Sequence, residues 1–225
     1  GRIARSLPEL TRRRLLPPAR RIGVTTRLLG GGLLPWYFGA RRRGGSESIR
    51  DIAHRLRVAA EGLGPTYIKL GQIISSGQGL FPAELVDEFA NLRDRVPPER
   101  FAVVRDVVEA ELGRPLHEVF AHFERSPLAA ASIAQVHAAT LRSGEEVVVK
   151  VQRPLVAQRV HQDLRVMAWI APFLVGRIPV AALANPPALV DLFAETIAEE
   201  LDFRLEADNM LAVARSFADL GQRGY

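Results

Sequence analysis

The 225-residue sequence contains no cysteine. Disulfide bonds and thiolate metal sites are therefore excluded, and cysteine usage says nothing about the redox state of the compartment. The histidines do not show the spacing of a metal-ligand motif; they are His54, His117, His122, His137 and His161. We therefore expect no metal site within this chain.

The chain also lacks an uninterrupted run of about 20 apolar residues, the length that a membrane-spanning helix needs. Residues 22–40 come closest, but Arg27, three successive glycines (30–32) and Pro35 interrupt them. A signal-peptide cleavage pattern is also missing. We therefore expect a protein on the cytoplasmic side of the membrane.

Positive charge is concentrated at the start of the chain. Residues 1–43 contain 11 Arg and one Glu, a net charge of +10, whereas the remaining residues carry 19 basic and 24 acidic side chains, a net charge of −5. A basic segment on an acidic domain is not the footprint of a nucleic-acid-binding domain. We therefore expect no nucleic-acid partner.

Residues 12–43 allow three interpretations. Trp36, Tyr37 and Phe38 lie among arginines, a composition that suits the headgroup region of a membrane. Basic segments gain about 1 kcal/mol per charge at an anionic surface. We predict an interfacial membrane contact first, a helix docked on the rest of the protein second, and a targeting segment third.

Apolar periodicity predicts several helices before the middle of the chain. The ranges are 47–61, 65–76, 82–92, 99–112 and 116–123. In the second of these, Lys69 and Gln72 are three residues apart and share one face of an otherwise apolar helix. Both side chains are predicted to point into a buried environment; the alternative is a lysine whose charged end reaches solvent.

Residues 127–154 form the stretch around which the chain is organised. An alanine-rich turn leads into a predicted hairpin of residues 133–140 and 147–151, with Ser143 and Gly144 at the turn. Lys150 interrupts a β-branched run, and a buried lysine is costly unless an anion receives it. A small-residue loop, a hairpin and a lysine begin a kinase-type nucleotide site; an edge hairpin with an exposed lysine is the alternative.

The last part of the chain predicts a helix over residues 155–174, a proline-rich break, and one long helix over residues 188–217. Glu195, Glu199, Asp202 and Glu206 would form one acidic stripe on that helix, which a solvated face also explains. Glu200 projects towards the apolar side instead and needs a cation. Lys69 and Lys150 are the candidate partners.

Together these motifs resemble those of the UbiB family, the aarF-domain atypical kinases linked to quinone biosynthesis. Lys69–Gln72 matches the family's KxGQ motif, residues 129–133 together with 135–137 match its Ala-rich loop motif, and Lys150 matches its nucleotide lysine. Glu200–Asp202 matches the ExD motif, and Glu206 falls where the helix-C glutamate pairs with that lysine. The resemblance covers about residues 47–215. It departs from the family at residues 75–79, where an arginine and an aspartate are usual.

The resemblance implies an α+β fold: a kinase-like N-lobe with a small antiparallel sheet and helix C, and a helical N-terminal extension packed over the active site. The implied regions are 1–43, a basic segment that contacts a membrane; 44–123, the helical extension; and 124–225, the N-lobe. After Glu206 the sequence shows neither a catalytic-loop Asp with its Asn further downstream nor a DFG-type aspartate. We therefore expect the C-lobe and the Mg²⁺ ligands to lie beyond residue 225.

The same resemblance implies roles for individual residues. Lys150 and Glu206 would be catalytic, Lys150 would contact the phosphates of ATP or ADP, and Lys69 and Gln72 would meet Glu200 and Asp202 to close the protein-substrate site. The Ala-rich loop would bind the nucleotide through Ala129, Ala130, Ala131, Ser132 and Ile133.

The implied activity is ATP hydrolysis or small-molecule phosphorylation by a peripheral protein on the cytoplasmic side of the bacterial inner membrane. A lipid or quinone-like molecule would be a further partner. The alternative is a non-catalytic membrane-associated scaffold that keeps the kinase shape and binds a lipid or a partner protein.

Overall fold

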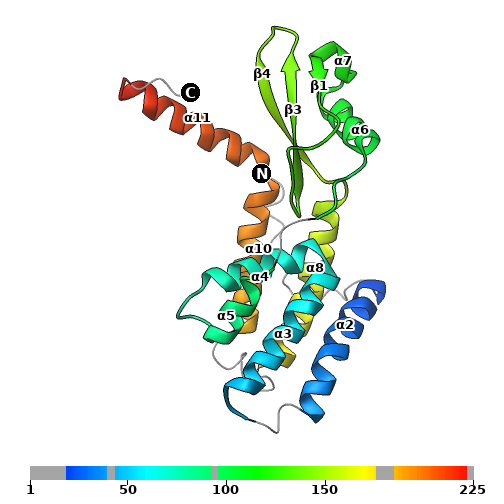
Figure 1. The fold of residues 1–225 in the computed structure, drawn as a ribbon, viewed down its shortest axis with the longest axis vertical. Helices are drawn as coiled ribbons and strands as arrows, with labels where there is room; N and C mark the ends of the chain where they lie inside the picture. The colour runs from blue at the N-terminus through cyan, green and yellow to red at the C-terminus, as the bar shows by residue number, and fades with distance from the viewer. Residues whose placement is uncertain (1–18, 40–43, 93–95, 176–184, 222–225) are drawn as a thin grey trace.

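The structure, a computed structural model, describes residues 19–39, 44–92, 96–175 and 185–221. A helical bundle forms one end of the molecule and a small sheet the other (Figure 1). The bundle contains α2 (Ala19–Phe38), α3 (Gly45–Leu63), α4 (Pro65–Ser76), α5 (Ala83–Phe89), α8 (Val156–Leu174) and α10 (Pro186–Leu201). No helix in these ranges is both long enough and apolar enough to cross a membrane.

The bundle forms where the sequence places apolar residues at helical spacing. In α3, Ile52 and Ala53 are fully buried on the face that the sequence predicted. Gly64 has a φ of 96°, a conformation that glycine adopts without strain, and this ends α3. Pro65 then begins α4, since the first helical residue needs no backbone N–H donor.

The sheet has four strands, and all its pairings are antiparallel. They are β1 (Phe120–Phe123), β2 (Ala129–Ala130), β3 (Ala134–Leu141) and β4 (Glu146–Gln152). β4 pairs with β3 along nearly all its length, so β1 and β2 share the other edge of β3. Gly144, at a φ of 92°, makes the predicted hairpin turn.

A second hydrophobic core lies under this sheet, where α6 (Phe101–Leu112) and α7 (Leu116–Val119) pack. Val104 and Val108 of α6 are buried with Phe120 of β1 and Val151 of β4. In these two cores α6, α7 and β1 pack with the sheet, while α8 and α10 pack in the bundle.

Four local predictions were wrong. The predicted helix over residues 188–217 is two helices, α10 and α11 (Phe203–Asp219), because Asp202 leaves the helical conformation between them. Pro186 and Pro187 begin α10 rather than break the chain, since proline suits the first helical positions. Residues 120–123 are a strand that pairs with β3, and the Ala-rich turn contains β2.

The arrangement of α2 supports the second interpretation of the N-terminal segment, a docked helix. Trp36, predicted at the headgroup level, is 2 % exposed, and its Nε1 donates to the Ser48 carbonyl at 3.1 Å. The Arg21 guanidinium pairs with the buried carboxylate of Asp163 on α8. Arg12–Arg14 and Arg41–Arg43 lie outside the described residues.

Candidate nucleotide site

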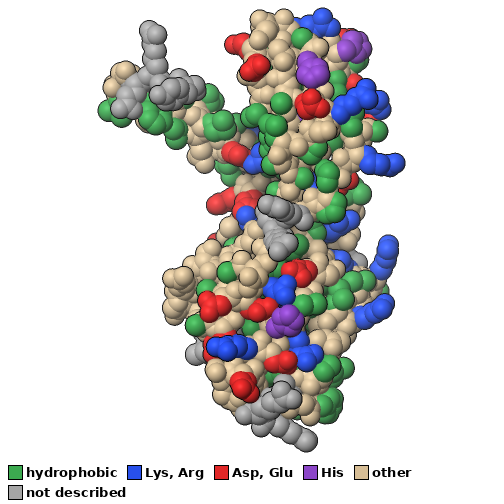
Figure 2. All heavy atoms as spheres, viewed as in Figure 1, with side chains coloured by type: hydrophobic (Ala, Val, Ile, Leu, Met, Phe, Trp, Pro, Cys, Tyr) green, Lys and Arg blue, Asp and Glu red, His purple; other side chains and the backbone are tan. Residues whose placement is uncertain are grey.

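A cleft of about 1260 Å³ lies between the hairpin and α11, where α11 leaves the body of the molecule. Lys150 comes from β4, Lys69 from α4, Glu200 from α10 and Glu206 from α11. Figure 2 shows acidic and basic side chains close together at this junction. The cleft therefore collects four predicted site residues from elements that are far apart in the sequence.

Lys150 and Glu206 are ion paired across the cleft. The Nζ atom of Lys150 lies 2.5 Å from Oε2 of Glu206 and 4.6 Å from the centre of the Phe203 ring. The prediction that Lys150 is buried was wrong, because β4 shows one face to solvent: Val148 is 67 % exposed, and the Lys150 side chain is 41 % exposed. An exposed ammonium beside a cleft can contact an anionic ligand without a conformational change that would first expose it.

The second lysine of the cleft, Lys69, pairs with Glu200, the carboxylate for which the sequence offered both lysines as candidate partners. The Nζ atom of Lys69 lies 2.6 Å from Oε1 of Glu200. Gln72 does not line the cleft, and its backbone carbonyl accepts hydrogen bonds from the hydroxyls of Ser75 and Ser76. One of the two polar side chains of the KxGQ motif therefore faces the cleft.

Asp202 is held by Arg204, two residues further along the chain. Its carboxylate accepts a hydrogen bond from the backbone N–H of Arg204 at 3.2 Å and pairs with the guanidinium of the same residue at 2.7 Å. The Arg204 hydrogen bonds lower the pKa of Asp202 to about 2. Asp202 thus caps the first turn of α11, and the structure does not bring it to Lys69.

The Ala-rich loop divides into a strand and a cleft-facing part. Ala129 and Ala130 form β2, whereas Ala131, Ser132 and Ile133 line the cleft. The backbone N–H of Ala131 donates to the Ala134 carbonyl at 2.8 Å. Among the described residues, only Leu155 and glycines have a positive φ, so the alanines are unstrained in a loop that needs no glycine.

Sequence reasoning missed three polar groups next to the cleft. Gln152 donates to the Leu201 carbonyl at 3.0 Å and so holds the end of α10. Arg153 donates to the Ala131 carbonyl at 2.8 Å, and Gln135 accepts from the backbone N–H of Glu99 at 2.8 Å. The signal was present but unused, since Gln135 lies in the alanine-rich motif and Gln152 and Arg153 directly follow the Lys150 strand.

The part of the chain that the structure describes contains no group of three or more His, Asp or Glu side chains placed to hold a metal ion. Glu200 and Glu206 both line the cleft, but each already pairs with a lysine. These residues therefore do not by themselves fit a Mg²⁺ site.

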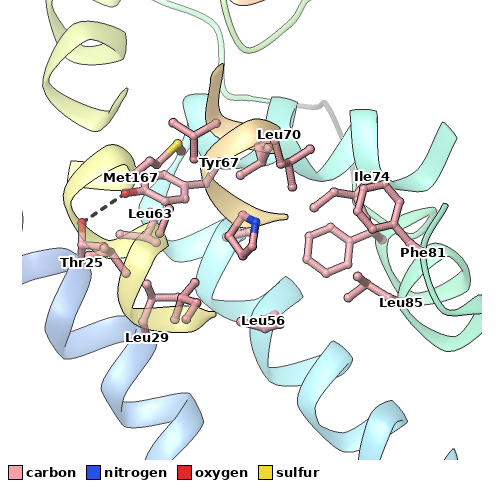
Figure 3. A pocket seen from close by; sticks show the side chains of 18 residues that line it. Thr25, Leu29, Leu56, Leu63, Tyr67, Leu70, Ile74, Phe81, Leu85 and Met167 are labelled. Atoms are coloured by element: carbon pink, nitrogen blue, oxygen red, sulfur yellow. Dashed lines mark hydrogen bonds between the residues drawn. The ribbon is translucent and has the colours of Figure 1, made fainter. Parts of the chain in front are cut away.

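An apolar cavity of about 200 Å³ lies within the helical bundle, lined by residues of α2, α3, α4, α5, α8 and α10 as well as Phe81 (Figure 3). The hydroxyls of Thr25 and Tyr67 lie 3.4 Å apart at one side of it. Burial raises the pKa of Tyr67 well above its ordinary value, so its hydroxyl stays protonated. The cavity and the cleft are separate, but Lys69 and Leu70 place α4 beside both.

Comparison with known proteins identifies the family. A sequence model of the ABC1 atypical kinase-like domain matches residues 91–222, which include the sheet, α11 and every residue that lines the cleft except Lys69. The chain belongs to the ABC1 atypical kinase-like family. The resemblance to the UbiB group that the motifs indicated is confirmed, as is the α+β fold with a kinase-like N-lobe sheet and added helices.

The chain is also similar to individual ABC1 family members. A probable protein kinase UbiB of Shewanella loihica is 41% identical over 200 residues, 86% of this chain and 36% of that protein. A probable protein kinase UbiB of Pseudomonas paraeruginosa is 43% identical over 198 residues, 85% of this chain and 35% of the relative.

A third relative, an uncharacterized protein of Mycobacterium tuberculosis, is 50% identical over 153 residues, 67% of this chain and 30% of that protein. The chain thus spans about a third of the length of the curated relatives that it matches.

Proposed function

We propose that this chain forms the lysine side of the nucleotide site of an atypical kinase or ATPase. The observation that carries the proposal is the Lys150–Glu206 pair, 2.5 Å between Nζ and Oε2, beside the Ala131–Ile133 part of the loop. A carboxylate orients the ammonium, and a small-residue loop lies close enough for backbone to approach a ligand. That is the arrangement a kinase uses to hold nucleotide phosphates.

In this proposal the phosphates of ATP or ADP lie against Lys150. Glu206 keeps the ammonium at the cleft, and residues Ala131 to Ile133 of the Ala-rich loop border the phosphates, while Ala129 and Ala130 hold the start of the loop on β3. ATP would usually enter such a site as its Mg²⁺ complex. The reaction would be phosphoryl transfer to a small molecule or to water.

The Lys69–Glu200 pair would be a gate in the same proposal. It joins α4 to the end of α10 at the cleft. A large protein substrate would need to lie at this place. Gln72 and Asp202, the other members of the predicted gate, would act indirectly: Gln72 through α4, and Asp202 by capping α11. Such a closed site favours a small substrate over a protein.

The membrane and lipid parts of the prediction rest on the resemblance and on composition. We propose peripheral attachment to the cytoplasmic face of the inner membrane through the arginines of residues 12–43, and a lipid or quinone-like molecule as the substrate class. Helix α2 is docked through Trp36, but Tyr37 and Phe38 at its end are exposed. These two aromatic side chains support such a contact.

Replacing Lys150 with methionine in the intact protein tests the proposal. The side chain is 41 % exposed, so Lys150→Met should fold like wild type while ATP-dependent turnover falls by about 100-fold or more, since a phosphate-binding cation is lost. Arg105→Met, which removes an exposed cation of α6 far from the cleft, is the matched control and should leave turnover unchanged. ATP binding and turnover equal to wild type in Lys150→Met would refute the nucleotide role.

A further inference from the structure

Arg153, the residue directly after β4, is 8 % exposed although it is charged. Its guanidinium donates to the Ala131 carbonyl at 2.8 Å through Nε, to Oε1 of Glu99 at 2.9 Å through Nη1, and to the Pro97 carbonyl at 2.9 Å through Nη2. Ala131 belongs to the Ala-rich loop, whereas Pro97 and Glu99 lie between α5 and α6. The planar, forked guanidinium of Arg153 therefore joins the Ala-rich loop to the segment that connects the bundle to the sheet.

The strand explains why Arg153 points there and Lys150 does not. Side chains alternate across a strand, so Lys150 and Gln152 face the cleft side, where they reach Glu206 and the end of α10. Val151 faces the opposite side and is buried in the core of the sheet. Arg153 follows on that side, and its backbone N–H donates to the carbonyl of the loop residue Ile133 at 2.9 Å.

Glu99, the charged partner of Arg153, is itself held in place. Its backbone N–H donates to Oε1 of Gln135, whose Nε2 lies 2.8 Å from Nε2 of His137. Because the amide oxygen of Gln135 already accepts, its nitrogen donates to His137, which places the imidazole proton on Nδ1. That Nδ1 donates to the Glu124 carbonyl at 2.8 Å. Gln135 and His137 are 2 % and 0 % exposed, so Arg153 is anchored to a buried and rigid network.

We propose that Arg153 is a positioning residue of the nucleotide site: it holds the Ala131 carbonyl and thereby sets the loop against the phosphates. This inference rests on the proposed function. Ala131 and Ser132 line the cleft, whereas Arg153 does not. In a trans peptide the carbonyl and the next N–H point in opposite directions. The Arg153–Ala131 bond therefore also sets the direction of the Ser132 N–H, and with it the backbone that a phosphate would meet.

The test uses Arg153→Met in the intact protein, with amide hydrogen exchange and ATP affinity as the two readouts. Without nucleotide, exchange should rise in residues 129–134, where the Ala131 N–H bonds to Ala134, while the far end of the hairpin stays protected. ATP affinity should fall by about tenfold, the scale of a misplaced binding group. A rise in exchange over the whole sheet, no rise in the loop, or ATP affinity equal to wild type would each overturn the positioning role.

Two further variants make the test decisive. Arg142→Met removes another guanidinium of the same sheet, which donates to the His117 carbonyl at 3.0 Å at the opposite end of the hairpin; both readouts should match wild type. If Arg153→Met does not fold, Arg153→Lys keeps the charge but loses the fork. It should show the same changes to a smaller extent, and wild-type behaviour would overturn the inference.

The wild-type protein separates this inference from the proposed function. If it does not bind ATP, the nucleotide proposal fails, and exchange in residues 129–134 still decides whether Arg153 holds the loop.

Discussion

The Nζ atom of Lys69 lies 2.6 Å from Oε1 of Glu200, and this ion pair joins α4 to the end of α10 at the cleft. The sequence predicted a buried pair, because α4 is otherwise apolar and Glu200 projects away from the acidic stripe, towards the apolar side of its helix. The two side chains are in fact 23% and 34% exposed. Water therefore screens their attraction, and the pair contributes geometry more than stability.

Replacing Lys69 with alanine should lower the free energy of unfolding by about 1 kcal/mol, because a partly exposed pair is worth little. Chemical denaturation of the variant measures this value. Arg105→Ala, which removes the more exposed Arg105–Asp106 pair, should cost less. A loss of more than about 3 kcal/mol in Lys69→Ala would contradict the prediction and indicate a buried, desolvated pair.

Gly71, the glycine of the KxGQ motif, is the point where α4 meets α5. A Cβ atom there would lie 2.1 Å from Cδ1 of Leu92 and 2.5 Å from Cδ1 of Phe89. Gly71→Ala should therefore destabilise the protein by about 1–3 kcal/mol through overpacking, measured by denaturation with urea. Gly31→Ala is the matched control: no atom lies within 4 Å of its Cβ position, so it should stabilise α2 by about 0.5–1 kcal/mol. Equal effects of the two changes would exclude a packing role.

Asp163 ties α8 to α2. Its carboxylate is 0% exposed and pairs with the Arg21 guanidinium, which also donates to the Leu63 carbonyl at 2.7 Å. Asp163→Ala should cost about 3–5 kcal/mol, since it leaves a largely buried cation unpaired. Asp51→Ala, which breaks the more exposed Asp51–Arg55 pair of α3, should cost about 1 kcal/mol or less.

The fluorescence of Trp36 reports whether α2 stays docked. With Trp169 changed to phenylalanine, emission from Trp36 should be blue-shifted and protected from quenching by acrylamide in the parent. Asp163→Ala should shift it to the red. An unchanged emission spectrum and unchanged stability in that variant would show that the pair does not hold α2.

Glu88 of α5 links two side chains of α3, Arg57 at 2.7 Å and His54 at 2.9 Å. The Arg57 hydrogen bond lowers the pKa of Glu88 below its ordinary value of 4.5. A lowered pKa in the folded state gives stability that is complete above the unfolded pKa and is lost as pH falls through the folded one. Glu88→Gln should therefore be less stable than wild type at neutral pH, and the difference should shrink in acid. Melting curves from pH 7 down to about pH 3 measure it; a constant difference would contradict this assignment.

Local patterns predicted a large part of this molecule. The apolar spacing of residues 47–61 and 65–76, the Gly64–Pro65 boundary and the Ser143–Gly144 turn each correspond to elements of the structure. Periodicity also predicted one helix over residues 116–123, where α7 gives way to β1 after Val119, and one over residues 188–217, where the fold has two helices. In both, an apolar pattern suited a helix, and pairing with β3 or the capping carboxylate of Asp202 decided otherwise.

The sequence by itself identified the two lysines of the cleft, since Lys69 and Lys150 are the only lysines in the chain. The tertiary structure decided how they are partnered: Glu206 reaches Lys150 only because α11 turns away from α10 at Asp202, and α10 meets α4 only because the chain returns to the bundle after the hairpin. The tertiary structure also decided that the Lys150 side chain is partly exposed, because the alternation of side chains along β4 does not show which face of the strand meets solvent. The Arg153 contacts depended most on the fold, because the acceptors of this side chain lie in two segments that are 22 and up to 57 residues away from it in the sequence, and only packing brings such groups together.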